Sequence, residues 1–296
     1  MSKRASANQV TQSTQHRSDI RDHDMPSAVI RDSAAFDHAT EEYVIEEHVI
    51  EEHVIDDHVT DERVIDEHAS ADRMLTPIGI EQLFHTMLDA MGPTGWWPAE
   101  TDYEIMVGAV LIQNASWRNA ERSLEALREA DALKPRVIAS MDNEQLQQLI
   151  RPSGFFRNKS RALQEVTRWY LNQYDSDPRN AHAIPDEQLR AQMLGLFGIG
   201  GETADDLLLY VFNRRTFIAD TYSRRLFRFL GYNAPDRYAI FREQYQPMVL
   251  ASRLTVADLQ EFHGLIDEYG KIYRDDAAKV DSFLGEWGSA KRRWYS

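Results

Sequence analysis

The stretch from Leu194 to Arg224 constrains the fold of this chain more than any other. An apolar helix end runs into Gly198-Ile199-Gly200-Gly201, and a second helix with apolar side chains at helical spacing follows at once. The glycines permit backbone conformations with positive φ and remove the Cβ atoms that would hold another backbone away. The pattern predicts two helices joined by a glycine hairpin, with free N–H groups at the start of the second helix directed towards a phosphate.

Asp220 lies about twenty residues after these glycines and follows the apolar pair Phe217-Ile218. It opens a predicted helix, because Leu226, Phe227 and Leu230 follow at helical spacing. Aspartate is a preferred N-cap, so a capping role explains Asp220 when it is taken alone. Other N-cap residues predict further helix starts at Ser116, Asp142 and Thr255.

A glycine hairpin followed at this distance by an Asp that opens a helix resembles the helix-hairpin-helix DNA glycosylases of the endonuclease III superfamily. The resemblance covers roughly residues 75–275. It implies an all-α, two-lobed fold with the active-site cleft between the lobes. The expected lobes are a six-helix lobe over about 101–230 and a second lobe from 75–100 and 231–296.

The same resemblance implies roles for the residues of the hairpin stretch. Asp220 is expected to be the catalytic residue, acting at the flipped nucleotide. The hairpin is expected to grip double-stranded DNA that contains damaged bases. The hairpin residues expected to bind DNA are Gly198, Gly200, Gly201 and Thr203.

The first 74 residues differ in composition from the rest of the 296-residue chain. They carry 7 Lys and Arg against 18 Asp and Glu, so most of the net charge of −15 lies there. Residues 41–70 repeat a pentad such as Glu-Glu-His-Val-Ile, and neither a helix nor a strand buries every Val-Ile pair on one side. We therefore expect a disordered acidic tail over 1–74 and a glycosylase domain over 75–296. The tail histidines imply no rigid ligand geometry, so we predict no metal site.

A loop with adjacent tryptophans, Gly95-Trp96-Trp97-Pro98, follows the first predicted helix. Two such residues in a loop can plug the domain, or they can offer an aromatic platform on which a planar base stacks. A similar Trp-Trp-Pro loop lines the base pocket in the branch of the superfamily that excises 3-methyladenine. This resemblance implies that Trp96, Trp97 and Pro98 belong to a base pocket, with Trp117 bordering it.

Further DNA contacts are implied by three segments. Gln113 and Asn114 lie in a tight turn between helices, where their amides can satisfy local backbone groups. In the family the matching turn enters the minor groove and fills the gap left by the flipped nucleotide. Arg157 and Lys159 are either solvated surface charges or phosphate contacts of a Gly-aromatic-x-x-x-Lys stretch that family members share. Arg224 belongs to a basic stripe beside the hairpin that suits the phosphate backbone.

Glu202 stands where the relatives with lyase activity carry the lysine that forms a Schiff base. A carboxylate cannot form an imine, so we expect a monofunctional glycosylase of base-excision repair that leaves an abasic site. A carboxylate here again resembles the 3-methyladenine branch, which places Glu202 in the base pocket and predicts alkylated purines as substrates. The alternatives are a mismatch or oxidised-pyrimidine glycosylase on the same fold, and a DNA-binding protein without catalysis.

The chain contains no cysteine, which excludes disulfides and a cysteine-ligated iron–sulfur cluster, so we expect no cofactor. In the 3-methyladenine branch a lysine in an equivalent Gly-Lys stretch can be carbamylated and replace the cluster as a structural tie. Lys271 matches it in position and is either such a lysine or an ordinary surface lysine.

No apolar run approaches a membrane span and no secretory signal is seen. We therefore expect a cytoplasmic, nucleoid-associated bacterial monomer.

Overall fold

The computed structural model describes residues 78–288. All regular elements in this range are helical, and the range contains no strand, which confirms the all-α prediction. The acidic tail expected over 1–74 and its boundary lie outside the described residues. None of the helices within 78–288 has the length and apolar character that crossing a membrane requires.

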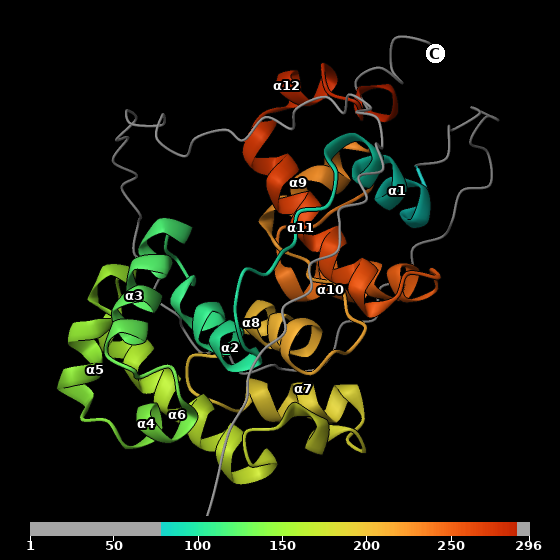
Figure 1. Ribbon diagram of the computed structural model, residues 1–296. Coiled ribbons are helices and arrows are strands. Elements are labelled where there is room, and N and C mark those ends of the chain that lie inside the picture. Colours follow the sequence, from blue (N-terminus) through green and yellow to red (C-terminus); the bar gives the residue numbers. More distant parts are fainter. Residues whose placement is uncertain (1–77, 289–296) are drawn as a thin grey trace, which may run out of the picture. The chain divides into compact units, whose positions relative to one another are not determined.

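Twelve α-helices and four short helical turns follow one another within the described range (Figure 1). The helices are α1 (Ile80–Met91), α2 (Asp102–Leu111), α3 (Trp117–Glu129), α4 (Pro135–Ser140), α5 (Asn143–Leu149), α6 (Phe156–Tyr174), α7 (Asp186–Leu194), α8 (Gly201–Asp206), α9 (Thr221–Phe229), α10 (Tyr238–Leu250), α11 (Val256–Ile272) and α12 (Asp276–Val280). The short turns are η1 (Arg151–Ser153), η2 (Pro178–Ala181), η3 (Leu207–Val211), which has π geometry, and η4 (Gly285–Trp287).

Local capping fixes several of these helix starts. The side chain of Ser116 accepts a backbone N–H at the start of α3, and that of Asp142 does the same at α5. Thr255 and Asp258 form a reciprocal capping box at α11. Each cap satisfies N–H groups that have no partner within the helix, which is why these short polar side chains precede apolar helical segments.

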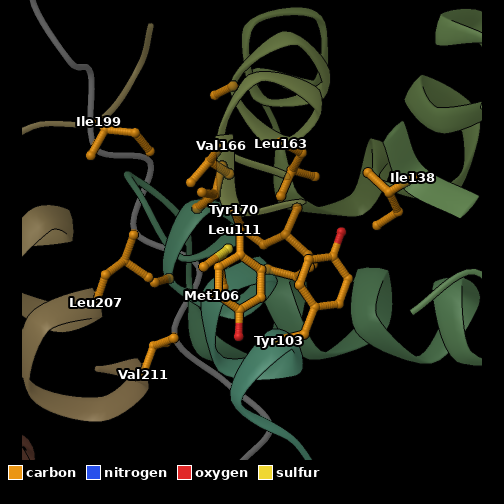
Figure 2. Packing of buried hydrophobic residues seen from close by; sticks show 14 of the residues in the cluster. Tyr103, Met106, Leu111, Ile138, Leu163, Val166, Tyr170, Ile199, Leu207 and Val211 are labelled. Atoms are coloured by element: carbon orange, nitrogen blue, oxygen red, sulfur yellow. The ribbon is translucent and has the colours of Figure 1, made fainter. Parts of the chain in front are cut away.

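A first hydrophobic core gathers side chains from α2 to η3. In Figure 2, Tyr103 and Met106 of α2, Tyr170 of α6, and Leu207 and Val211 of η3 point towards one another. Nearly every residue of α2 is buried, so this helix runs through the centre of the core. Full burial of an apolar side chain of this size stabilises a fold by about 1.5–3 kcal/mol.

A second hydrophobic core joins the beginning and the end of the described range. Helix α1 packs on α11, and α11 packs on α9, so α1 lies beside the C-terminal helices (Figure 1). The chain then runs from α1 to α2 through the tryptophan loop. Trp97 and Ile105 pack against both cores, and the segment from α8 to η3 contributes side chains to both.

The division between the two cores differs from the expected lobe boundary near residue 230. Leu207 and Leu208 belong to the first core, whereas Leu209 and Tyr210 belong to the second. Helix α9 lies wholly in the second core, because its strongly apolar face packs against α11. The first core nevertheless includes Val211 and extends to Phe212, and the second core continues from Phe217. The chain therefore passes from the first core to the second between residues 212 and 217, before the expected position.

Candidate active site

The predicted hairpin joins α7 to α8, and its three glycines differ in what they do. Gly198 has φ +76°, and a Cβ there would lie 2.8 Å from the Cβ of Ala162 in α6. Gly200 has φ −87° and open space around it, and it precedes α8 without offering a side-chain cap. At Gly201 a Cβ would lie 3.1 Å from the Tyr238 ring. Only Gly198 requires glycine for its φ, while the backbone at Gly200 is open to an approaching group.

Helix α6 supports the hairpin from within the first core. The backbone N–H of Phe197 donates to Oε1 of Glu165 at 2.8 Å. The Arg161 guanidinium carbon lies 3.7 Å from the centroid of the Phe197 ring, which is a cation–π contact. Phe197 therefore fixes the hairpin to α6 through both its backbone and its ring.

The turn between α2 and α3 supports the hairpin from another direction. Nε2 of Gln113 donates to the carbonyl oxygen of Gly198 at 3.0 Å and to Oγ1 of Thr203 at 2.8 Å. Asn114 has φ +49°, and its side chain is exposed. The Gln113 amide is thus occupied in holding the hairpin, and Asn114 remains the exposed amide of the turn.

Asp220, the residue predicted to be catalytic, is the N-cap of α9. It is 9% exposed, and its Oδ1 accepts the backbone N–H of Ser223 at 2.7 Å. Ser223 is itself held by a bond from Oγ to the carbonyl oxygen of Ile218 at 2.9 Å. The capping role and a role at the site are therefore compatible, because the cap orients the carboxylate.

Glu202 stands near Asp220, at the first turn of α8. Its side chain is reached by solvent, yet protein atoms surround it closely enough to displace much of its water. This partial desolvation, and then the nearby Asp220 carboxylate, raise the pKa of Glu202 to about 7, while the Arg224 guanidinium acts in the opposite direction. Glu202 therefore holds a proton at a higher pH than an ordinary glutamate does.

Tyr210 and His263 bring the second core to the site. The Tyr210 hydroxyl lies 2.7 Å from Nδ1 of His263 in α11 and donates to the carbonyl oxygen of Gln260 at 3.0 Å. Burial lowers the pKa of His263, although the Asp220 and Asp267 carboxylates act against this. Sequence reasoning assigned no role to these two residues. Tyr210 could have been found from the sequence, because Glu202, Asp206 and Tyr210 recur every four residues and so lie on one helix face. His263 could not, because its contact with Tyr210 depends on how α11 packs.

The tryptophan loop is anchored to α11. The backbone N–H groups of Thr94 and Gly95 donate to the Glu261 carboxylate, the second at 3.3 Å. Gly264 allows the loop to lie against the helix, because a Cβ there would be 2.5 Å from the Cβ of Trp96. The peptide bond between Trp96 and Trp97 is cis.

The three predicted pocket tryptophans form one cluster. The ring centroids of Trp96, Trp97 and Trp117 lie 5.2–5.9 Å apart, and Trp97 lies 5.5 Å from Tyr210. Pro98 is exposed beside them. The structure thus brings the tryptophans together and, through Tyr210 of η3, links them to the helical segment that begins with α8 and carries Glu202. Trp96 also lines a hollow of about 460 Å³, which includes none of the α8 carboxylates.

Lys159 does not have the surface position that a phosphate contact requires. It is only 3% exposed, and its Nζ donates to the carbonyl oxygens of Leu111 at 2.9 Å and Ser153 at 2.6 Å. Burial lowers its pKa to about 8. The prediction that Lys159 contacts phosphate is wrong, because its ammonium satisfies two buried carbonyl groups. Arg157 is exposed, as a phosphate contact requires.

Arg224 and Lys271 are both tied to neighbours. Arg224 donates to Oγ1 of Thr221 at 3.0 Å and to the carbonyl oxygen of Asp236. Nζ of Lys271 lies 2.6 Å from Asp267 and 2.9 Å from Glu268. Although burial acts to lower it, these carboxylates raise the pKa of Lys271. The geometry disfavours carbamylation, because that reaction needs a neutral amine and would set a third anion beside two carboxylates.

Comparison with known proteins places the chain in a family. Residues 107–249 match the model of the HhH-GPD superfamily base excision DNA repair proteins. A protein of Methanocaldococcus jannaschii, assigned as a DNA repair glycosylase, is 37% identical over 205 residues, which are 69% of this chain and 92% of that one. The chain belongs to the HhH-GPD superfamily, that is, to the helix-hairpin-helix glycosylases related to endonuclease III.

Solved structures agree with this assignment. The H. pylori 3-methyladenine DNA glycosylase MagIII, bound to 1,N6-ethenoadenine, has a TM-score of 0.53 and 27% identity, covering 64% of this chain and 93% of that chain. A non-covalent endonuclease III–DNA complex has a TM-score of 0.57 and 18% identity, covering 73% and 97%. At that identity the second similarity concerns the fold alone.

Proposed function

We propose that this protein is a monofunctional DNA glycosylase that removes alkylated purines, such as 3-methyladenine, from double-stranded DNA and leaves an abasic site. The observation that carries the proposal is the position of Asp220, which is fixed at the start of α9 and lies close enough to Glu202 of α8 for the two carboxyl groups to interact electrostatically. The segment from α8 to η3 contains no lysine.

The hairpin supports binding to the DNA backbone. The open backbone at Gly200 and the uncapped start of α8 provide N–H groups for a phosphate. Exposed Arg157 and Asn114 add a cation and an amide on segments of the same core. Phosphate contacts of this kind position a protein on DNA without reading its sequence.

The tryptophan cluster supports recognition of the extruded base. A glycosylase must take its target base out of the duplex, and the base then stacks on aromatic side chains. Because the rings of Trp96, Trp97 and Trp117 contact one another, a base would stack on the solvent-facing side of the cluster. An N-alkylated purine is cationic or electron-poor, and tryptophan is the best cation–π partner. The similarity to MagIII, a 3-methyladenine DNA glycosylase, favours this class.

The reaction proposed for Asp220 is hydrolysis of the bond between the sugar C1′ and the base nitrogen. As this bond breaks, the base leaves with the electron pair and positive charge develops on the sugar, where a carboxylate stabilises it. Water then forms the new bond to C1′, and Asp220 accepts its proton. Glu202 cannot form an imine with the sugar, so strand cleavage by β-elimination is not expected.

Duplexes carrying 3-methyladenine, 7-methylguanine, thymine glycol or a T·G mismatch test the proposal. Each is incubated with the protein and analysed with and without alkali. We expect nicks only after alkali and only with alkylated DNA, and a rate loss on the order of 100-fold or more in Asp220→Asn. Nicks without alkali would overturn the monofunctional assignment. Release from thymine glycol or T·G alone would favour the rival specificity, and no release from any duplex would leave a DNA-binding protein without catalysis.

A further inference from the structure

Two adjacent aspartates of α8 have opposite surroundings. Asp205 is fully buried, and its carboxylate meets Arg190 at 2.9 Å, Arg242 at 2.8 Å and the Tyr238 hydroxyl at 2.9 Å. Asp206 is also buried, at 6% exposure, and its side chain makes no hydrogen bond or ion pair with any residue in the described range, although its oxygens keep a little contact with solvent. A buried carboxyl group without a partner is unfavourable for folding, so Asp206 calls for a reason other than stability.

Asp206 lies on the side of the helix that faces the site. It is four residues after Glu202 and four before Tyr210, and this spacing puts the three side chains on one face. Tyr210, at the end of that row, contacts the Trp97 ring and His263. The row therefore leads from the hairpin to the tryptophan cluster, with Asp206 at its centre.

The groups around Asp206 favour its neutral form. Burial raises the pKa of Asp206 well above its ordinary value, and the carboxylates of Glu202, Asp205 and Asp220 add to this. The other titratable groups that interact with it are the hydroxyls of Tyr210 and Tyr238, both neutral. A neutral carboxylic acid offers one O–H donor and one carbonyl acceptor side by side.

We propose that Asp206 is a specificity-determining residue of the base pocket, which binds the polar edge of the extruded base through its carboxylic acid. The inference rests on the proposed function, because it requires a base to enter beside Asp220. The matching ligand is a purine edge with a ring or exocyclic acceptor next to an N–H donor. The acid O–H donates to that acceptor, and the acid carbonyl accepts the N–H. An adenine-type amidine edge and a guanine-type lactam edge both have this pattern.

The test compares two duplexes that differ only in the presence of the base. One carries 7-methylguanine on a 2′-fluoro-arabino sugar, which resists hydrolysis, and the other carries a tetrahydrofuran abasic analogue. Affinities are measured by fluorescence anisotropy for the full chain, for Asp206→Asn and for Asp206→Leu. The leucine variant keeps the branched shape without polar atoms, whereas the asparagine variant keeps one donor and one acceptor in place.

We expect Asp206→Leu to weaken binding of the base-bearing duplex about 10-fold, as when a polar ligand group loses its buried partner, with no change for the abasic duplex. The deciding quantity is the ratio of the affinity for the base-bearing duplex to the affinity for the abasic duplex. In Asp206→Asn this ratio should stay within about threefold of its value in the unmodified protein. The melting temperature of Asp206→Leu should not fall, because no partner is lost. An unchanged ratio in Asp206→Leu would overturn the inference. Equal loss of both duplexes together with a lower melting temperature would show a structural role and overturn it as well.

Excision is measured in parallel on a duplex with the ordinary, hydrolysable 7-methyl-2′-deoxyguanosine. Absence of release by the unmodified protein would count against the proposed function. The affinity ratio would still decide on Asp206, because it needs no catalysis.

Discussion

At the scale of single residues, the surroundings of Glu202 change its chemistry. The same side chain on an open surface is ionised at neutral pH, whereas here partial desolvation and the Asp220 carboxylate bring its pKa to about 7. At pH values just below 7 most of the Glu202 carboxyl groups therefore carry a proton, unlike those of an ordinary glutamate.

A first prediction concerns the pH dependence of stability in Glu202→Gln. Between the ordinary glutamate value of 4.5 and about 7, folded Glu202 binds a proton that the unfolded chain releases, so its contribution to stability falls as pH rises. Above pH 7 both states are ionised and the loss is complete. The melting temperature of the variant minus that of the original should therefore rise from pH 4.5 to 7 and then stay constant. The rise should be small, about 2 °C, because solvent screens the group. Calorimetric scans across this range check it, and a difference that does not vary with pH would contradict it.

A second prediction separates a buried cation from an exposed one. Lys159→Met should lower the free energy of unfolding by about 1–3 kcal/mol, because two buried carbonyl groups lose their donor. Arg157→Met should leave stability unchanged and reduce the salt dependence of DNA affinity by roughly one phosphate contact. Urea unfolding and DNA binding at several salt concentrations measure both. The opposite pattern, a reduced salt slope with unchanged stability in Lys159→Met, would restore the phosphate role.

At the scale of elements, the hairpin depends on its neighbours for its shape. Glu165 and Arg161 of α6 hold Phe197, and Gln113 of the α2–α3 turn holds Gly198 and Thr203. The two segments expected to meet DNA are therefore one bonded unit, and disturbing either one should affect the other.

Gln113→Met tests this coupling. The variant keeps the length of the side chain but loses both bonds, so the free energy of unfolding should fall by about 1–2 kcal/mol. Affinity for abasic duplex should fall with it, because the hairpin loses its support. Gln145→Met, the same change at an exposed position of α5, serves as the matched control and should alter neither quantity. An effect of Gln113→Met on neither stability nor affinity would show that the turn and the hairpin are independent.

At the scale of the whole described domain, Asp205 connects the two cores. It lies on α8, its partner Arg190 belongs to α7, and its partners Tyr238 and Arg242 belong to α10. Thr216 donates to it as well, at 3.2 Å. One buried carboxylate thus joins elements on both sides of the core boundary.

Asp205→Ala should destabilise the domain by about 3–5 kcal/mol, because it leaves two arginines largely buried without their counter-charge. Asp186→Ala removes a partly exposed ion pair with Arg214 and should cost less than about 1 kcal/mol. Chemical denaturation followed by circular dichroism compares the two. If both variants lowered the free energy of unfolding by a similar small amount, the bonds of Asp205 would contribute little to stability.

Features that depend on neighbouring residues could be predicted from the sequence, and features that depend on distant ones could not. Ser116 and Thr255 mark helix starts because a cap acts within three residues of itself. Lys159 was misplaced because one of its acceptors, Leu111, lies 48 positions away. His263 was missed for the same reason, since Tyr210 lies 53 positions away. The residues expected around Asp220 stay predictions of function until they are tested.

The continuous helical segment from α8 to η3 has one more consequence, which concerns spacing. It follows directly on Gly200, whose backbone we propose binds a phosphate, and it carries Asp206 six positions later on the same helical element. At a rise of about 1.5 Å per residue, the two lie roughly 9 Å apart along the helix axis. In the proposed complex this length sets how far a nucleotide must leave the duplex before its base meets the acid. Insertion of a single residue would turn Asp206 by about 100° around the axis, so the segment is expected to tolerate substitutions far better than changes in length.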